Sequence, residues 1–400
     1  MVSTNRYTSK YFVILSERYS IRLLTLLATL PILDTVDLSF YASYSICQFI
    51  CSLYLAGFQE VSRNLIGEQG GNISNFQKKY SIILAIITFC LIIIYVKFFA
   101  RDFPILFLLA ISPFLNLAGF KRTLAIESSG KITNLAVVRV GAVILGVTIS
   151  YICLSSHSMY LLVTLSLLCD LFICLSVYVL KYSEASNIQY IEDPNFLQLS
   201  LRNILLGFKP IAERFGIMII ANSILSGIYS LSFQIISSYV GILIYSFNSL
   251  IQIQSKFNKI EEKLLDKGYL YLILISIISL PGIHYVGSIL FDARWFAVSD
   301  FVAAILASKL IGIQNILTFN NFRKNFSTLK WTIFYCHIPF TSALISAGFY
   351  LGKDFALVCI VLSGILETWF YCGGNIFRNR NFLIRVSIIM LGIFSVRMVL

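Results

Sequence analysis

Charged residues are scarce in this chain of 400 residues, where they make up 12% of the sequence against 58% hydrophobic residues. A soluble domain would carry about twice that charged fraction, so the composition excludes an ordinary soluble globular protein. Histidine is rarer still: His157, His284 and His337 stand on separate segments. Their spacing does not fit a metal site, and we expect no metal.

Cysteine motifs are also missing, because none of the nine cysteines forms a CxxC pair. Most of them fall inside apolar stretches, where we interpret them as small packing residues. The net charge of +12 could indicate a nucleic-acid partner. The basic residues gather in short loops beside apolar stretches, however, which is typical of the cytoplasmic side of a membrane protein, so we expect no nucleic acid.

Twelve apolar stretches of helical length run from about Tyr11 to Ile376. In hydrocarbon every backbone polar group must be bonded within its own segment, so runs near 20 residues are read as helices. The sequence therefore predicts an all-α polytopic membrane protein with about 12 transmembrane helices. The predicted spans are 11–33, 39–58, 80–99, 103–120, 133–153, 159–180, 203–226, 229–250, 269–291, 297–317, 330–350 and 355–376. A further run, 382–400, fits either a thirteenth span or an interfacial helix.

The loops alternate in charge, and this alternation predicts their sidedness. Basic residues such as Lys79, Lys131, Lys263 and Lys324 occupy every second loop. By the positive-inside rule we expect these loops and the N-terminus to lie in the cytoplasm. The outer loops are too short to hold the catalytic groups of a membrane enzyme, so we expect a protein that is not an enzyme.

The spans divide into two sets of six, which suggests an internal duplication. Glu17-Arg18 in the first span resembles Glu213-Arg214 in the seventh. The predicted parts are an N-terminal six-helix bundle at 1–181, a cytoplasmic linker at 182–200, a C-terminal six-helix bundle at 201–376 and a C-terminal segment at 377–400.

Charged side chains inside the predicted spans are the candidate functional residues, because a charge near the bilayer centre costs about 2.5–3.5 kcal/mol on insertion scales. They are Glu17, Arg18, Arg22, Arg139, Asp170, Lys209, Glu213, Arg214, Lys309 and Glu367. With Gly227 at the outer face, Glu213 would lie about 21 Å below it, in the cytoplasmic third of the membrane. Snorkelling to the interface or structural pairing between helices are the alternatives to a transport role.

The two halves, the Glu213-Arg214 pair and the segment Gly227-Ile228-Tyr229-Ser230 resemble the O-antigen and polysaccharide flippases. These are Wzx-type members of the multidrug/oligosaccharidyl-lipid/polysaccharide (MOP) exporter superfamily. The chain departs from the common pattern in having Glu213 where Asp is usual. The resemblance implies two bundles around a cationic cavity that moves an undecaprenyl-pyrophosphate-linked oligosaccharide, such as a lipopolysaccharide O-antigen unit, to the outer leaflet. It also implies a polysaccharide polymerase and a chain-length regulator as partners.

We assign the predicted site residues on this basis. The expected substrate-binding residues are Arg18, Arg22, Arg139, Lys209, Glu213, Arg214 and Lys309. Asp170 and Glu367, near the membrane midplane, are the candidates for coupling to a gradient of H⁺ or Na⁺, and no cofactor is expected. A cation-coupled exporter of small molecules from the same superfamily is the main alternative, and a membrane-embedded polysaccharide polymerase or ligase is another.

Overall fold

The computed structural model describes the chain in segments separated by gaps. The described residues are 13, 16–17, 20–21, 23–25, 27–29, 31–33, 35–62, 72–73, 75–128, 132–154, 158–180, 190–191, 196–238, 262–291, 293–322, 328–372 and 380–399. The chain divides into two compact units, Met1–Ile211 and Ala212–Leu400. The predicted boundaries around 182–200 stay predictions, and each unit is described by itself.

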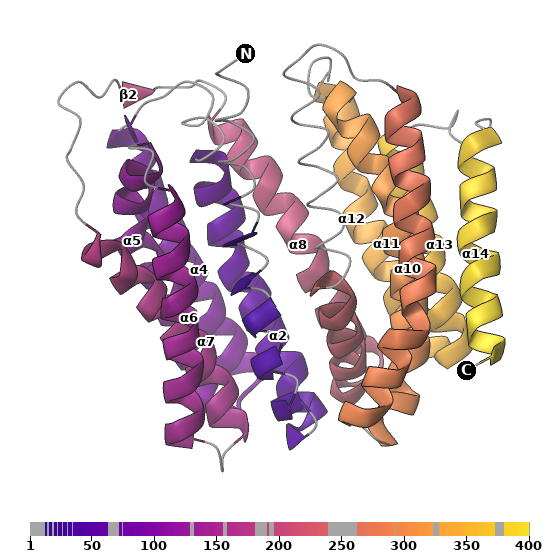
Figure 1. Ribbon diagram of the computed structural model, residues 1–400, viewed down its shortest axis with the longest axis horizontal. Coiled ribbons are helices and arrows are strands. Elements are labelled where there is room, and N and C mark those ends of the chain that lie inside the picture. The colour runs from indigo at the N-terminus through magenta and orange to yellow at the C-terminus, as the bar shows by residue number, and fades with distance from the viewer. Residues whose placement is uncertain are drawn as a thin grey trace. The chain divides into compact units, whose positions relative to one another are not determined.

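The first unit is built from long apolar helices that run side by side (Figure 1). Its elements are α2 (Leu38–Tyr54), the π-helix η1 (Leu55–Glu60), α4 (Asn75–Phe99), the 3-10 helix η2 (Pro104–Ile111), α5 (Ser112–Ser128), α6 (Ile132–Leu154), α7 (Ser158–Val179) and the start of α8 (Phe196–Ile220). Two short strands, β1 (Asn72–Ile73) and β2 (Tyr190–Ile191), pair in parallel. The strand before α4 thus pairs with the strand before α8, so the starts of these two helices lie at the same end of the unit.

The second unit begins within α8, just after Pro210. Residues 223–238 form the next helix, and Asn222 caps it by accepting a hydrogen bond from the Leu225 amide at 2.7 Å. The following elements are α10 (Glu262–Phe291), α11 (Ala293–Phe322), α12 (Thr328–Leu351), α13 (Lys353–Cys372) and α14 (Arg380–Val399).

The observed helices confirm an all-α membrane protein. Within the described residues, seven helices are long and apolar enough to cross a membrane, and three shorter apolar helices accompany them. Several predicted boundaries were wrong, however. The 103–120 span begins as a 3-10 turn and continues as α5 to Ser128. Gly227 lies inside a helix, because the capping side chain of Asn222 ends the turn five residues earlier.

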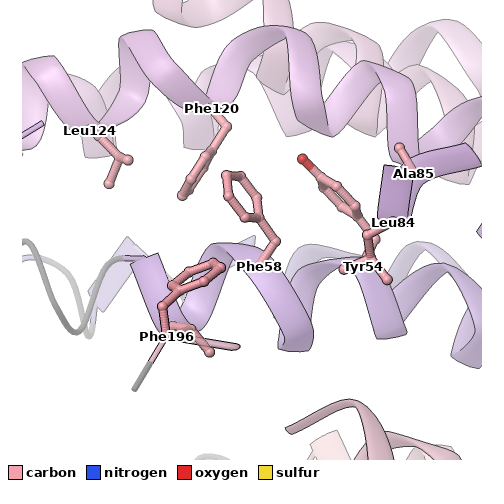
Figure 2. Packing of buried hydrophobic residues seen from close by; sticks show 8 residues of the cluster. Tyr54, Phe58, Leu84, Ala85, Phe120, Leu124 and Phe196 are labelled. Carbon is pink, nitrogen blue, oxygen red and sulfur yellow. The ribbon is translucent and has the colours of Figure 1, made fainter. Parts of the chain in front are cut away.

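One aromatic cluster holds the first unit together at the end that carries β1 and β2. Figure 2 shows rings and aliphatic side chains from α2, η1, α4, α5 and α8 meeting there. The cluster consists of Tyr54, Phe58, Val61, Leu84, Ala85, Phe120, Leu124 and Phe196. The rings of Phe58 and Phe120 meet edge to face at a centroid distance of 5.1 Å, a geometry that aromatic quadrupoles favour.

The π-helix η1 anchors the start of α8 beside this cluster. The Ser200 hydroxyl donates to the carbonyl of Gly57, and the Asn203 amide donates to that of Ala56 at 3.2 Å. A π-turn disturbs the regular helical ladder, so its carbonyls can accept such side-chain donors. The first half of α8 is thereby fixed to α2 within the first unit.

Small residues bring helices into close contact in both units, as is usual in membrane bundles. A Cβ added at Gly146 would lie 3.2 Å from the backbone nitrogen of Cys169, so α6 and α7 pack backbone to backbone. A Cβ at Gly364 would lie 2.7 Å from the carbonyl oxygen of Ser308, which shows the same closeness between α13 and α11. In each unit one helix, α7 or α13, packs along two others, α5 and α6 or α11 and α12.

Candidate functional site

Glu17 and Arg139 form a buried ion pair in the first unit. The Arg139 guanidinium donates to Glu17 Oε1 at 2.9 Å and to the Thr123 hydroxyl at 2.9 Å. Their exposed fractions are only 9% for Arg139 and 7% for Glu17. The two charges come from the first span and from α6, and their pairing removes much of the cost of burying either one. This contact offers Arg139 a structural role in addition to the predicted one.

Asp170 on α7 has a different environment, in which the partners are neutral. Its carboxylate accepts a hydrogen bond from the hydroxyl of Ser112, the first residue of α5. Asn116 lies one turn further along α5, and its amide donates to the Ser112 carbonyl at 3.1 Å. A carboxylate held by hydroxyl and amide groups can take up a proton or a small cation without displacing a built-in positive charge.

A small polar pocket connects Asp170 with Arg139 inside the first unit. Its lining residues are Gln59, Leu115, Asn116, Gly119, Phe120, Thr123, Arg139, Asp170, Ile173 and Cys174. Its volume is about 30 Å³, enough for a water molecule or a small ion and too small for an oligosaccharide. The pocket thus suits an ion or proton, and the substrate needs another place.

In the second unit, charged side chains gather around two aromatic rings of the helix 223–238. The Tyr229 hydroxyl donates to Glu213 Oε2 at 2.8 Å. The Arg214 guanidinium lies 4.4 Å from the centroid of the Phe233 ring and 5.6 Å from that of Tyr229. The Lys309 ammonium lies 4.5 Å from the same Phe233 centroid. Both cations are within the range at which a ring face attracts positive charge.

The carboxylate of Glu367 on α13 interacts electrostatically with Tyr229, so it belongs to the same group. We call Glu213, Arg214, Tyr229, Phe233, Lys309 and Glu367 the aromatic-charge cluster of the second unit. Lys309 and Glu367 stand on α11 and α13 and are 58 residues apart in sequence, as are Ser112 and Asp170 on α5 and α7. This equal spacing makes Lys309 the counterpart of Ser112 in sequence position.

The predicted site residues are therefore brought together in two groups, one in each unit. Lys209 is half-buried on α8, while Arg18 and Arg22 lie outside the described residues. Reasoning from sequence missed Ser112, Asn116, Thr123 and Phe233. Ser112 and Asn116 gave a weak signal, as polar residues four apart in an apolar stretch, but Phe233 gave none among 33 phenylalanines.

The depth expected for Glu213 was counted from a turn that the structure places elsewhere. The helix α8 ends at Ile220, seven residues after Glu213. The rise of a helix then puts Glu213 about 10 Å from that end of α8, instead of about 21 Å from Gly227. The depth of Glu213 in the membrane stays a prediction.

Comparisons with known proteins agree with this architecture. No protein-family model and no curated protein matches the sequence. A solved structure described as the inward-facing conformation of a multidrug resistance MATE family transporter of the MOP superfamily superposes with a TM-score of 0.57 at 11% identity. That match covers 92% of this chain and 95% of the other. The lipid II flippase MurJ in an inward closed conformation gives a TM-score of 0.54 at 11% identity, covering 97% and 93%.

The fold is therefore the one shared with these two solved structures, a multidrug transporter and a lipid II flippase. The protein is a multi-pass membrane protein with this fold. The fold expected from the resemblance is confirmed, and the Wzx-type family stays a prediction.

Proposed function

We propose that the protein is a flippase that moves an undecaprenyl-pyrophosphate-linked oligosaccharide, such as an O-antigen or other surface polysaccharide repeat unit, across the bacterial cytoplasmic membrane. The observation that carries this proposal is the convergence of Arg214 and Lys309 on the single ring of Phe233. The fold, which it shares with a lipid II flippase, supports it.

Two cations held at one ring make a site that favours a multiply charged anion. A pyrophosphate carries several oxygens, and the planar fork of an arginine can bind two of them at once. The ring of Phe233 contacts both cations. The pyrophosphate would bind at Arg214 and Lys309, and Lys209, Arg18 and Arg22 stay predicted substrate-binding residues.

The other parts of the ligand have different requirements. The prenyl tail is apolar and stays in the bilayer, while the sugars need hydroxyl and amide partners from several helices. Transport then follows from alternating access, in which the two units change their relation around the bound headgroup. The only chemistry is binding and release, so we propose no catalytic step. The polymerase and the chain-length regulator are the proposed partners downstream.

Replacing Arg214 tests this function. We expect Arg214→Ala to lower export of the glycan to the cell surface by roughly 10- to 100-fold, the loss of a charge-assisted hydrogen bond of about 1.5–3 kcal/mol. Arg214→Lys should restore export in part, because lysine keeps the charge and loses the fork. Arg101→Ala is the matched control, since Arg101 is exposed at the end of α4. Full glycan export by the triple variant Arg18→Ala, Arg22→Ala, Arg214→Ala at normal protein level would contradict the proposal.

A cation-coupled exporter of small molecules is the second candidate, and the MATE-like fold favours it. The two functions differ in what accumulates when the protein is absent. A flippase leaves lipid-linked oligosaccharide on the inner leaflet and no surface glycan. A drug exporter leaves surface glycan intact and makes cells sensitive to toxic cations. A polymerase or ligase would instead leave single repeat units translocated.

A further inference from the structure

The helix α14 runs along α10 in the same direction. The guanidinium of Arg385 lies 4.8 Å from the ring centroid of Tyr269. A Cβ added at Gly392 would lie 2.5 Å from Cδ1 of Ile277. The two contacts are seven residues apart on α14 and eight apart on α10, so the helices lie side by side and parallel (Figure 1). With 20 residues, α14 is about 30 Å long, the thickness of the hydrocarbon core.

The exposed face of α14 is mainly apolar, with the small hydroxyl side chains of Ser387 and Ser395 among its exposed residues. Leu383, Ile384, Met390 and Leu391 are 46%, 46%, 43% and 67% exposed. The opposite face packs against α10 and α11 and buries Phe382, Arg385, Ile389 and Ile393. A helix lying in the membrane interface would show the reverse arrangement, with charged residues outward and apolar residues toward the bilayer. This face fits lipid acyl chains.

The arginine that interrupts the apolar run is accommodated inside the unit. Arg385 is 8% exposed and packs on Tyr269, whose hydroxyl donates to the carbonyl of Leu310 at 2.6 Å. The charge therefore sits among α10, α11 and α14 near the first turns of α14. The following segment, 386–396, carries no charge, and Arg397 stands near the other end of the helix.

The end of α14 can be assigned to one side of the second unit. Because α14 is parallel to α10, its last residues lie toward the end of the unit where α10 gives way to α11. The α12–α13 turn lies at that same end, since Lys353 forms an ion pair of 2.6 Å with Asp300, two turns into α11. We propose that α14 is a thirteenth transmembrane helix. Its last residues then lie on the same side of the membrane as the α12–α13 turn. The face that carries Leu383, Ile384, Met390 and Leu391 is in contact with lipid.

Site-directed labelling in intact cells tests this assignment. Single cysteines at Asp354, at Arg378 and directly after Leu400 are placed in a background without the native cysteines. Each is treated with a membrane-impermeant maleimide before and after permeabilisation. We expect the position after Leu400 to label from the same side as Asp354→Cys and from the side opposite to Arg378→Cys. Labelling from the same side as Arg378→Cys would overturn the proposal, because both ends of α14 would then lie on one side of the membrane.

A spin label gives a second readout that does not depend on sidedness. A label at Leu391 should be accessible to lipid-soluble oxygen and shielded from a water-soluble nickel complex, whereas a label at buried Ile389 should be shielded from both. Accessibility of the Leu391 label to the nickel complex would show water at this face and would also overturn the proposal. If cysteine variants fail to accumulate, fusions of alkaline phosphatase and of green fluorescent protein after Leu400 in the native chain show on which side of the membrane the end of α14 lies.

Discussion

At the scale of single residues, three acidic side chains inside the helices have distinct kinds of partner. Glu17 is paired with a guanidinium, Glu213 accepts from a phenol, and Asp170 accepts from an alcohol. These differences matter because a carboxylate exchanges a proton or cation at least cost where it is not paired with a permanent positive charge. Asp170, which accepts from the Ser112 hydroxyl, is the acid best suited to respond to an ion gradient.

We expect Asp170→Asn to remove the dependence of glycan export on the proton or sodium gradient while the protein still inserts and folds. Asparagine can keep the contact with Ser112 but cannot exchange a charge. The measurement compares export with and without an ionophore that collapses each gradient. Glu367→Gln should have a smaller effect, and Asp300→Asn, which loses only a partly exposed ion pair, serves as control. Gradient dependence unchanged by both Asp170→Asn and Glu367→Gln would assign these acids a structural role.

At the scale of helices, glycines decide how closely neighbours approach. Hydrophobic burial supplies little driving force between helices within lipid, so close van der Waals contact has to hold α13 against α11. Gly364 is one such point, because an added Cβ would press on the backbone of Ser308. Gly141 in α6 is a natural comparison, since a Cβ there meets nothing within 4 Å.

Gly364→Ala should therefore destabilise the purified protein, at an overpacking cost of about 1–3 kcal/mol. Gly141→Ala should be neutral or stabilising by up to about 1 kcal/mol, because alanine favours the helix. Thermal or detergent-induced unfolding of both variants measures the difference. Equal stability of the two variants would mean that α11 and α13 can move apart at little cost in free energy.

At the scale of the whole molecule, the loop charges predict a topology that is open to test. Cysteines at Lys79, Lys131, Lys263 and Lys324 should label only from the cytoplasm. Those at Asp34, Ser156 and Lys353 should label from outside, because basic loops resist translocation. Labelling of the Lys263 and Lys353 positions from one side would break the twelve-span arrangement. The same experiment fixes the absolute orientation on which the outer position of the α14 end depends.

How much of the site could be predicted depends on how far apart in sequence the interacting residues are. The presence of Glu17, Arg139, Asp170, Arg214 and Lys309 within apolar runs is visible in the sequence, since charge in hydrocarbon is costly wherever it occurs. Their partners are not visible, because Glu17 and Arg139 are 122 residues apart. The role of Phe233 is likewise hidden, since any of many rings could have faced Arg214.

The sequence by itself determined that this is an all-helical membrane protein, because lipid forces each long apolar run to satisfy its backbone internally. It also indicated the two halves and most of the spans. The tertiary structure decided where helices end, as with the Asn222 cap, and which charges meet. It also decided that Arg385 is buried and that α14 packs along α10. These outcomes depend on contacts between helices far apart in sequence, which local hydropathy does not record.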